Sequence, residues 1–169
     1  MNNPIQDKLL QAYDTMLERL HTAVEKVETK TLPSIEEQLK HAQEKAVELG
    51  ELTRDEAEKV AEYVQRDVDD ISIYLEETKA EFSDWLSFES TLLESKIGDW
   101  LNLVADKTKL EWDKIKLQAI KSQLYHSGEI TGSGTLECIA CGQTLHFKKT
   151  GHIPPCPKCH KTEFKRNRK

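Results

Sequence analysis

The four cysteines of this chain are arranged as two CxxC pairs, and no other cysteine is present. Cys138 and Cys141 are separated from Cys156 and Cys159 by fourteen residues, a spacing typical of a zinc ribbon. Each CxxC pair forms a tight turn that presents two thiolates on one side, and two facing turns complete a tetrahedral S₄ shell. Because four protein ligands leave no coordination position for water, the sequence predicts one structural Zn²⁺.

Other roles for these cysteines are less well supported. A disulfide framework is disfavoured because we expect a cytoplasmic protein, whose thiols stay reduced. A redox dithiol needs one CxxC pair in a βαβ setting, whereas here two matched pairs flank a hairpin-like region. A site in which His160 replaces Cys159 as a ligand stays open. The residue after the second cysteine of such a turn often has a positive φ, which suits Gly142 and makes His160 a less usual occupant.

The segments around the cysteines predict a small β module. Residues 135–138, 143–148 and 162–166 have strand-like character, and six apolar side chains are available as its core: Leu136, Ile139, Leu145, Phe147, Ile153 and Phe164. Six side chains cannot offset the conformational entropy of ordering the module, so folding should depend on zinc binding, worth about 10–16 kcal/mol. Backbone hydrogen bonds and any docking on the helices would add to this. We expect a chelator to melt residues 136–166 while the helices persist.

Charge is divided unevenly along the chain. Residues 136–169 carry eight Lys and Arg against two acidic residues, whereas residues 1–135 carry 16 basic and 28 acidic residues. Four thiolates and one Zn²⁺ add −2, so the tail remains near +4 after metal loading. The acidic part is not expected to bind nucleic acid broadly. The candidate partner-binding residues are therefore the basic residues of the tail: Lys148, Lys149, Lys158, Lys161, Lys165, Arg166, Arg168 and Lys169.

The residues before the cysteine module predict amphipathic helices, because apolar residues recur at spacings of three and four. Pro33 predicts a kink or a restart of the first helical stretch. Gly50 suits a left-handed helix end, and Thr53 with Glu56 forms a capping box for a new helix. We therefore expect residues 50–53 to be the tip of an antiparallel helical hairpin.

The second helical stretch, residues 54–125, is longer than its partner. If it were one straight helix it would measure about 108 Å, against about 67 Å for residues 5–49. A break near Gly98, with residues 99–125 folding back as a third helix, would cover the excess. Pairing with a second chain would do the same, so a homo-oligomer formed through the helices is a further possibility.

These observations predict a mainly α fold. Residues 1–127 form an acidic, coiled-coil-like region, either an elongated antiparallel helical hairpin or a three-helix bundle. Five of the seven glycines lie between residues 128 and 151, which places the domain boundary near Gly128. Residues 128–135 are then a glycine-rich linker, and residues 136–169 are a β zinc ribbon with a basic tail.

Four sequence segments resemble a known family. The segments GELTR, DKTKLEW, YHSGEITGSGTLEC and CPKC are similar to those of the YbeL-like family of bacterial zinc-ribbon proteins. The resemblance spans most of the chain, from the predicted hairpin tip to residue 169. It implies a helical N-terminal region and a C-terminal zinc ribbon in which the four cysteines are the ligands. It implies no particular activity, and the family pattern has glycine where this chain has His160.

The sequence favours binding over catalysis. There is no glycine-rich phosphate loop and no HExxH motif, and the acidic residues are scattered as helix surface. His126, Ser127 and Glu129 are catalytic residue types, but the sequence around them is better explained as a helix end with Gly128 in the left-handed position. We therefore expect a protein that is not an enzyme.

Three hypotheses for the binding function follow. In the first, the basic ribbon of an accessory or regulatory protein docks on nucleic acid or on a transcription or translation complex. In the second, the helices self-associate as a scaffold and the ribbon is purely structural. In the third, the acidic hairpin tip (Glu51, Asp55 and Glu56) enters a channel of RNA polymerase, as in regulators of DksA-like architecture. No segment has the roughly 18 uncharged apolar residues of a membrane span, so we expect a soluble, cytoplasmic protein with no membrane partner.

Overall fold

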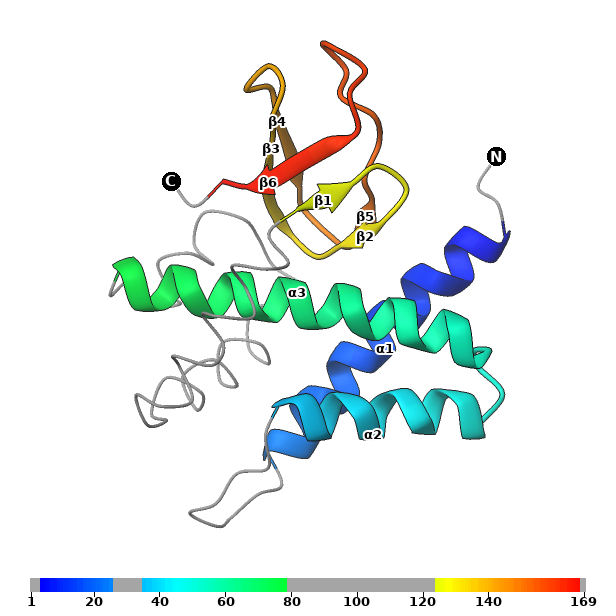
Figure 1. Ribbon diagram of the computed structural model, residues 1–169. Helices are drawn as coiled ribbons and strands as arrows, with labels where there is room; N and C mark the ends of the chain where they lie inside the picture. The colour runs from blue at the N-terminus through cyan, green and yellow to red at the C-terminus, as the bar shows by residue number, and fades with distance from the viewer. Residues whose placement is uncertain (1–3, 26–34, 79–123, 168–169) are drawn as a thin grey trace. The chain divides into compact units, whose positions relative to one another are not determined.

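The computed structural model describes residues 4–25, 35–78 and 124–167 of the chain (Figure 1). These residues form three helices followed by six short strands: α1 Pro4–Glu25, α2 Ile35–Glu48, α3 Arg54–Thr78, β1 Tyr125–His126, β2 Ile130–Thr131, β3 Gly134–Cys138, β4 Thr144–Phe147, β5 Gly151–His152 and β6 Glu163–Arg166. A helical part followed by a small antiparallel β region was the predicted order. The chain divides into two compact units, Met1–Gln65 and Arg66–Lys169.

Unit 1 contains α1, α2 and the first half of α3. The helix α1 begins at Pro4, a position where the missing N–H of proline removes no helical hydrogen bond. The helices α1 and α2 pack against each other, and the buried apolar side chains of the unit are Tyr13, Met16, Leu20, Leu39, Ala42, Ala46, Leu52, Ala57, Val60, Ala61 and Val64. The predicted interruption at Pro33 falls on residues 26–34, between α1 and α2, and these residues lie outside the described part.

The connection between α2 and α3 has the predicted helix-end geometry. Gly50 has a φ of 69°, and the Glu51 N–H donates to the Ala46 carbonyl at 3.0 Å, as in a Schellman motif. At the start of α3 the Thr53 N–H donates to the Glu56 carboxylate at 2.8 Å, and the Glu56 N–H donates to the Thr53 hydroxyl at 3.3 Å. This reciprocal pair is the predicted capping box. The chain runs in opposite directions along α2 and α3, so the two helices are antiparallel (Figure 1).

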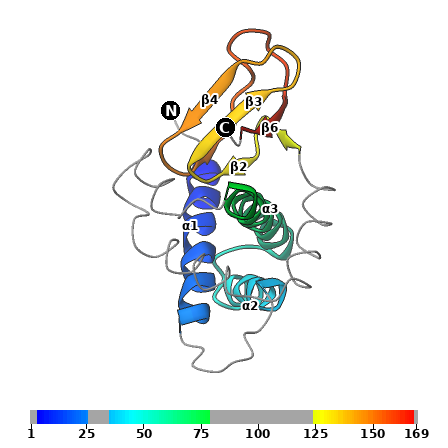
Figure 2. The same cartoon turned by 90° about the vertical axis from the view of Figure 1, so that its left-hand side faces the viewer.

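Unit 2 contains the second half of α3 and both β-sheets. The larger sheet has the strand order β1-β6-β3-β4 and is antiparallel throughout, and β2 pairs with β5 in a second, two-stranded sheet. Figure 2 shows β4, β3 and β6 side by side. The three predicted strand segments correspond to β3, β4 and β6 within one residue at each boundary.

The predicted linker is wrong, because residues 128–135 contain β2 and the first residues of β3. Ile130 and Thr131 are 1% and 0% exposed, so this segment belongs to the interior of the ribbon. Its glycines allow sharp turns, and Gly128 (φ 92°) and Gly134 (φ 140°) both have left-handed backbone conformations. The predicted helix end at Gly128 is also wrong, because a strand precedes it. The compact units divide at Gln65, within α3, and not near Gly128.

Two further predictions fall on residues that the structure does not describe. The break near Gly98 and the third helix over residues 99–125 lie outside the described residues, apart from the last two positions, where Leu124 is unstructured and Tyr125 begins β1. The basic residues Arg168 and Lys169 also lie outside them. In the described helices, no stretch is both long enough and apolar enough to cross a membrane.

Candidate metal centre

The first cysteine turn follows β3. Cys138 is the last residue of β3, and its N–H donates to the Gln143 carbonyl at 2.8 Å. The Gly142 N–H donates back to the Cys138 carbonyl at 2.9 Å, and Gly142 has a φ of 72°. These two hydrogen bonds close the turn and place the side chains of Cys138 and Cys141 on the same side.

The second cysteine turn repeats this geometry. The Cys156 N–H donates to the Lys161 carbonyl at 2.9 Å, and the His160 N–H donates to the Cys156 carbonyl at 2.9 Å. His160 has a φ of 59° and is the one residue other than glycine with a positive φ in the described part of the chain. The prediction that Gly142 and His160 occupy equivalent left-handed positions is confirmed.

The four sulfur atoms converge at one point between the turns. The Sγ atoms of Cys138 and Cys159 are 3.5 Å apart, those of Cys141 and Cys156 are 3.6 Å apart, and all four lie within 4.8 Å of one another. A tetrahedron with Zn–S bonds of about 2.3 Å has edges of about 3.8 Å. The residues present therefore fit one structural Zn²⁺ bound by four thiolates.

The environment of the thiols favours partial ionisation before metal binding. Burial opposes ionisation of Cys156, but backbone N–H donors from Cys159 and Lys158, with bonds to neighbouring thiols, outweigh it and lower the pKa of Cys156 to about 6. At Cys159 a backbone N–H donor from Lys161 is outweighed by burial and by the other three thiols, which raise its pKa to about 12. A metal cation must therefore displace protons from this set, as expected for a thiolate site.

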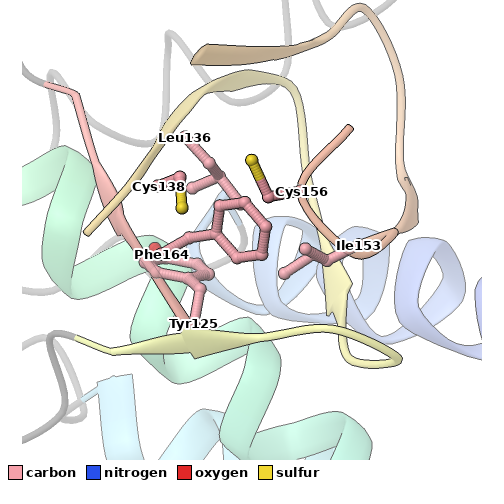
Figure 3. Close-up of a cluster of buried hydrophobic side chains, with 6 residues drawn as sticks. All are labelled: Tyr125, Leu136, Cys138, Ile153, Cys156 and Phe164. Carbon is pink, nitrogen blue, oxygen red and sulfur yellow. The ribbon is translucent and has the colours of Figure 1, made fainter. Parts of the chain in front are cut away.

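The site rests on the apolar core of unit 2. Its fully buried members are Tyr125, Leu136, Cys138, Ile153, Cys156 and Phe164. Figure 3 shows the Phe164 ring in the middle of this cluster, between Cys138 and Ile153. Of the predicted core, Leu136, Ile153 and Phe164 are buried and Leu145 and Phe147 pack against them. The prediction that Ile139 belongs to this core was wrong, because it lies in the first cysteine turn and is 47% exposed.

A set of buried charges lies beside the ribbon core, which we call the α3–ribbon network: Arg66, Asp67, Asp70, Tyr125, Glu129, Thr131 and Arg166. The Arg166 guanidinium donates to Asp67 at 3.0 Å, to the Thr131 hydroxyl at 3.0 Å and to the Ser133 carbonyl at 3.1 Å. The Tyr125 hydroxyl donates to Asp70. The side chains of Arg166 and Asp67 are only 8% and 4% exposed.

Arg66 completes this network from α3. Its guanidinium donates to the Glu129 carboxylate and to the Ile130 carbonyl, the latter at 3.0 Å, and its central carbon lies 3.9 Å from the centroid of the Tyr125 ring. Burial opposes the charge of Arg66, but Asp67, Tyr125 and Glu129 outweigh it and raise its pKa above the ordinary value. Both buried arginines therefore stay charged.

The helical half of this network was not predicted from the sequence. Arg66, Asp67, Asp69 and Asp70 form an almost continuous charged run within an amphipathic helix. The acidic residues of the helices were expected on the helix surface, yet these three aspartates and Arg66 are buried. One signal in the sequence could have identified these buried charges. An amphipathic surface helix has its charges on one face, whereas the charges of this run are distributed around a whole turn.

The predicted basic surface is only partly present. Arg166 was predicted to bind a partner, but its side chain is buried in the α3–ribbon network. Lys165 is exposed and pairs with Glu137 on the neighbouring strand at 3.5 Å. The remaining described lysines of the set are exposed, and none of them makes an ion pair with another described residue: Lys148, Lys149, Lys158 and Lys161.

These four exposed lysines occupy two ends of the ribbon. In the β3–β4 ladder Gly134 pairs with Phe147, and Lys148 and Lys149 follow Phe147 directly. Lys158 and Lys161 belong to the second cysteine turn, at the metal end of the ribbon.

The acidic hairpin tip is largely engaged within unit 1. Arg19 donates to both carboxylate oxygens of Glu51, at 2.8 and 2.6 Å. Glu56 caps α3 and also accepts from Lys8 at 2.9 Å. Asp55 is exposed in the first turn of α3, where an acidic residue is favoured by the helix dipole.

Two paired turns with four convergent cysteines on a small antiparallel sheet define a zinc-ribbon protein. The chain belongs to the family described as "Zinc-ribbon containing domain", whose model matches residues 22–168. It is 32% identical over 128 residues to "Uncharacterized protein YbeL" of Escherichia coli (strain K12), covering 76% of this chain and 79% of that protein. The same values hold for the protein of that name from Escherichia coli O157:H7. No solved structure matches the chain.

Proposed function

We propose that this protein is a non-enzymatic accessory protein of the cytoplasm that docks on nucleic acid through the exposed lysines of its zinc ribbon. The observation that carries the proposal is the state of Lys148, Lys149, Lys158 and Lys161. All four are exposed on a frame fixed by the metal, and none is neutralised by a described carboxylate. Most of the other charged groups of the ribbon are engaged in pairs, as in Lys165–Glu137 and Arg166–Asp67.

Free lysines on a rigid frame suit the phosphate backbone. Each phosphate contact releases condensed counterions, so affinity depends on the number of lysines engaged and falls steeply with salt. The two lysine pairs lie at opposite ends of the ribbon, which suits a ligand that extends along it.

Two other functions have less support. The acidic tip is a poor candidate for entry into an RNA polymerase channel, because Glu51 and Glu56 are held by Arg19 and Lys8. A self-associating scaffold would need an apolar surface on the helices. Among the described residues of unit 1, the large exposed apolar side chains are Ile5, at the start of α1, and Leu49, just after α2.

Fluorescence anisotropy with labelled single-stranded RNA and duplex DNA tests the proposal. We expect binding by the zinc-loaded chain at low salt, and weaker binding by the variants Lys148→Gln/Lys149→Gln and Lys158→Gln/Lys161→Gln. On a single strand, each double variant should reduce the slope of log affinity against log salt by about 1.4.

The variant Lys40→Gln/Lys59→Gln is the matched control, because it removes two exposed lysines of unit 1. Its affinity should stay close to that of the wild type. Absence of binding at low salt, or an equal loss in the control, would rule out recognition by the ribbon lysines. Concentration-dependent mass in sedimentation without nucleic-acid binding would favour the scaffold.

A further inference from the structure

A metal ligand is connected to α3 through three neighbouring strands at one level of the sheet. Cys138 in β3 is the register partner of Phe164 in β6, and Phe164 is the register partner of Tyr125 in β1. The Tyr125 hydroxyl then donates to Asp70 in α3. Each of these four residues is 3% exposed or less, so the connection is continuous packing with no solvent between its members.

A second connection starts from the same strand. Arg166 follows Phe164 by two residues on β6 and donates to Asp67, to the Thr131 hydroxyl and to the Ser133 carbonyl. Asp67 in turn accepts from the Gly132 N–H at 2.7 Å. The position of β6 therefore decides whether Asp67 keeps its ion pair with Arg166.

A buried network of charges is stable only when every charged group keeps its partners. Removing one partner from a buried ion pair leaves an uncompensated charge in a poorly solvated site, which is strongly unfavourable. If β6 moves, Asp67 and Asp70 together lose the Arg166 guanidinium, which lies 3.0 Å and 3.9 Å from their carboxylates, and these two acidic side chains lie one helical turn apart. Aspartate is also a weak helix former, so the segment has little intrinsic preference for its conformation.

The position of β6 depends in turn on the metal. Two of the six buried members of the ribbon core, Cys138 and Cys156, are zinc ligands. Without the metal the remaining four side chains are too few to hold a module of this size.

We propose that zinc occupancy of the ribbon controls the packing of residues 66–70 of α3, so that metal loss exposes this charged stretch in one cooperative step. The metal thereby acts on a helix that contributes none of its ligands. This inference goes beyond the proposed function and does not rest on it. It also replaces the expectation of a ribbon that unfolds alone, because the second half of α3 belongs to the same unit.

Hydrogen–deuterium exchange of the full chain tests the proposal. Peptides covering residues 66–78 and 125–166 should both exchange about tenfold faster or more after chelation, and zinc addition should restore both. Peptides covering α2 should change little. Unchanged protection of residues 66–78 while the ribbon exchanges would overturn the proposal, and so would simultaneous loss of protection in α2. The variant Cys156→Ser, which lacks a ligand, should reproduce the chelated pattern without a chelator.

Reciprocal coupling provides a second test that does not depend on unfolding. If zinc stabilises the network, the network must stabilise zinc binding by the same factor. Tyr125→Phe removes only the hydroxyl, which donates to Asp70 and accepts from Arg166, and it should lower zinc affinity about fivefold or more in competition with a chromophoric chelator. Arg19→Gln, which breaks an arginine–carboxylate pair of unit 1, should leave the affinity unchanged. Equal zinc affinity in Tyr125→Phe and the wild type would contradict the coupling.

Discussion

Arg166 and Asp67 are 99 positions apart in the sequence, and their Nη2 and Oδ1 atoms lie 3.0 Å apart in unit 2. The pair joins the last strand of the ribbon to α3 and is almost fully removed from solvent. Burying two ions costs desolvation free energy, which their mutual attraction offsets only when further hydrogen bonds satisfy each ion. Arg166 has these bonds to Thr131 and Ser133, and Asp67 accepts from the Thr131 hydroxyl and the Gly132 N–H.

A double-mutant cycle on Arg166 and Asp67 should show strong coupling. Arg166→Gln and Asp67→Asn should each lower the free energy of unfolding of unit 2 by about 3–5 kcal/mol, because each leaves the opposite charge buried. The double variant should cost less than the sum of the two by 1 kcal/mol or more. Urea denaturation followed by circular dichroism measures these values. Additive losses would show that the two side chains act independently.

Gly134 should be irreplaceable because of Arg166. A Cβ atom added at Gly134 would lie 2.2 Å from the Arg166 Nη1 atom, and the φ of 140° is itself unfavourable for other residues. Gly134→Ala should therefore displace the guanidinium and lower the midpoint of thermal unfolding of the zinc-loaded chain. Gly128→Ala is the matched control, since its φ is 92° but nothing lies within 4 Å of the added atom. Its cost should be only the backbone strain, about 1–3 kcal/mol, and an equal effect of the two variants would refute the steric explanation.

The metal site could be predicted from the sequence because its determinants are local. The spacing of Cys138 and Cys141, repeated at Cys156 and Cys159, defines two short turns, and four thiolates have one common geometry around zinc. The end of α2 at Gly50 could be predicted for the same reason. Helix termini depend on a few neighbouring residues with known conformational preferences.

The α3–ribbon network could not be predicted, because its partners are distant in sequence and its energetics depend on burial. Arg166 was grouped with the exposed lysines since composition cannot distinguish a charge in water from one paired inside the fold. The glycines between residues 128 and 135 were likewise ambiguous. A glycine-rich segment is flexible when no sheet contains it, but here the glycines allow the turns that bring Ile130 and Thr131 into the interior.

His160 should be replaceable by glycine without loss of the metal. Its φ of 59° is costly for a residue with a Cβ atom, by roughly 1–2 kcal/mol. His160→Gly should therefore keep one zinc per chain and raise the unfolding temperature of unit 2, whereas His160→Val should lower it. Native mass spectrometry gives the metal content. Loss of zinc from the glycine variant would show that the imidazole is a ligand.

The Arg19–Glu51 pair should contribute to stability only above acidic pH. The hydrogen bonds from Arg19 lower the pKa of Glu51 below its ordinary value of 4.5, so the folded chain releases this proton more readily than the unfolded chain. The stabilisation is therefore complete above about pH 4.5 and is lost as the pH falls through the lower pKa of the folded state. Because the pair is partly exposed, Arg19→Gln should cost only about 0.2–1 kcal/mol at pH 7, and progressively less as the pH falls below 4.5. The unfolding temperatures of the wild type and the variant, compared across this range, measure the effect, and in a Glu51→Gln background the substitution should have none at any pH. A difference that persists in the Glu51→Gln background would assign the effect to packing of the Arg19 side chain and not to its charge.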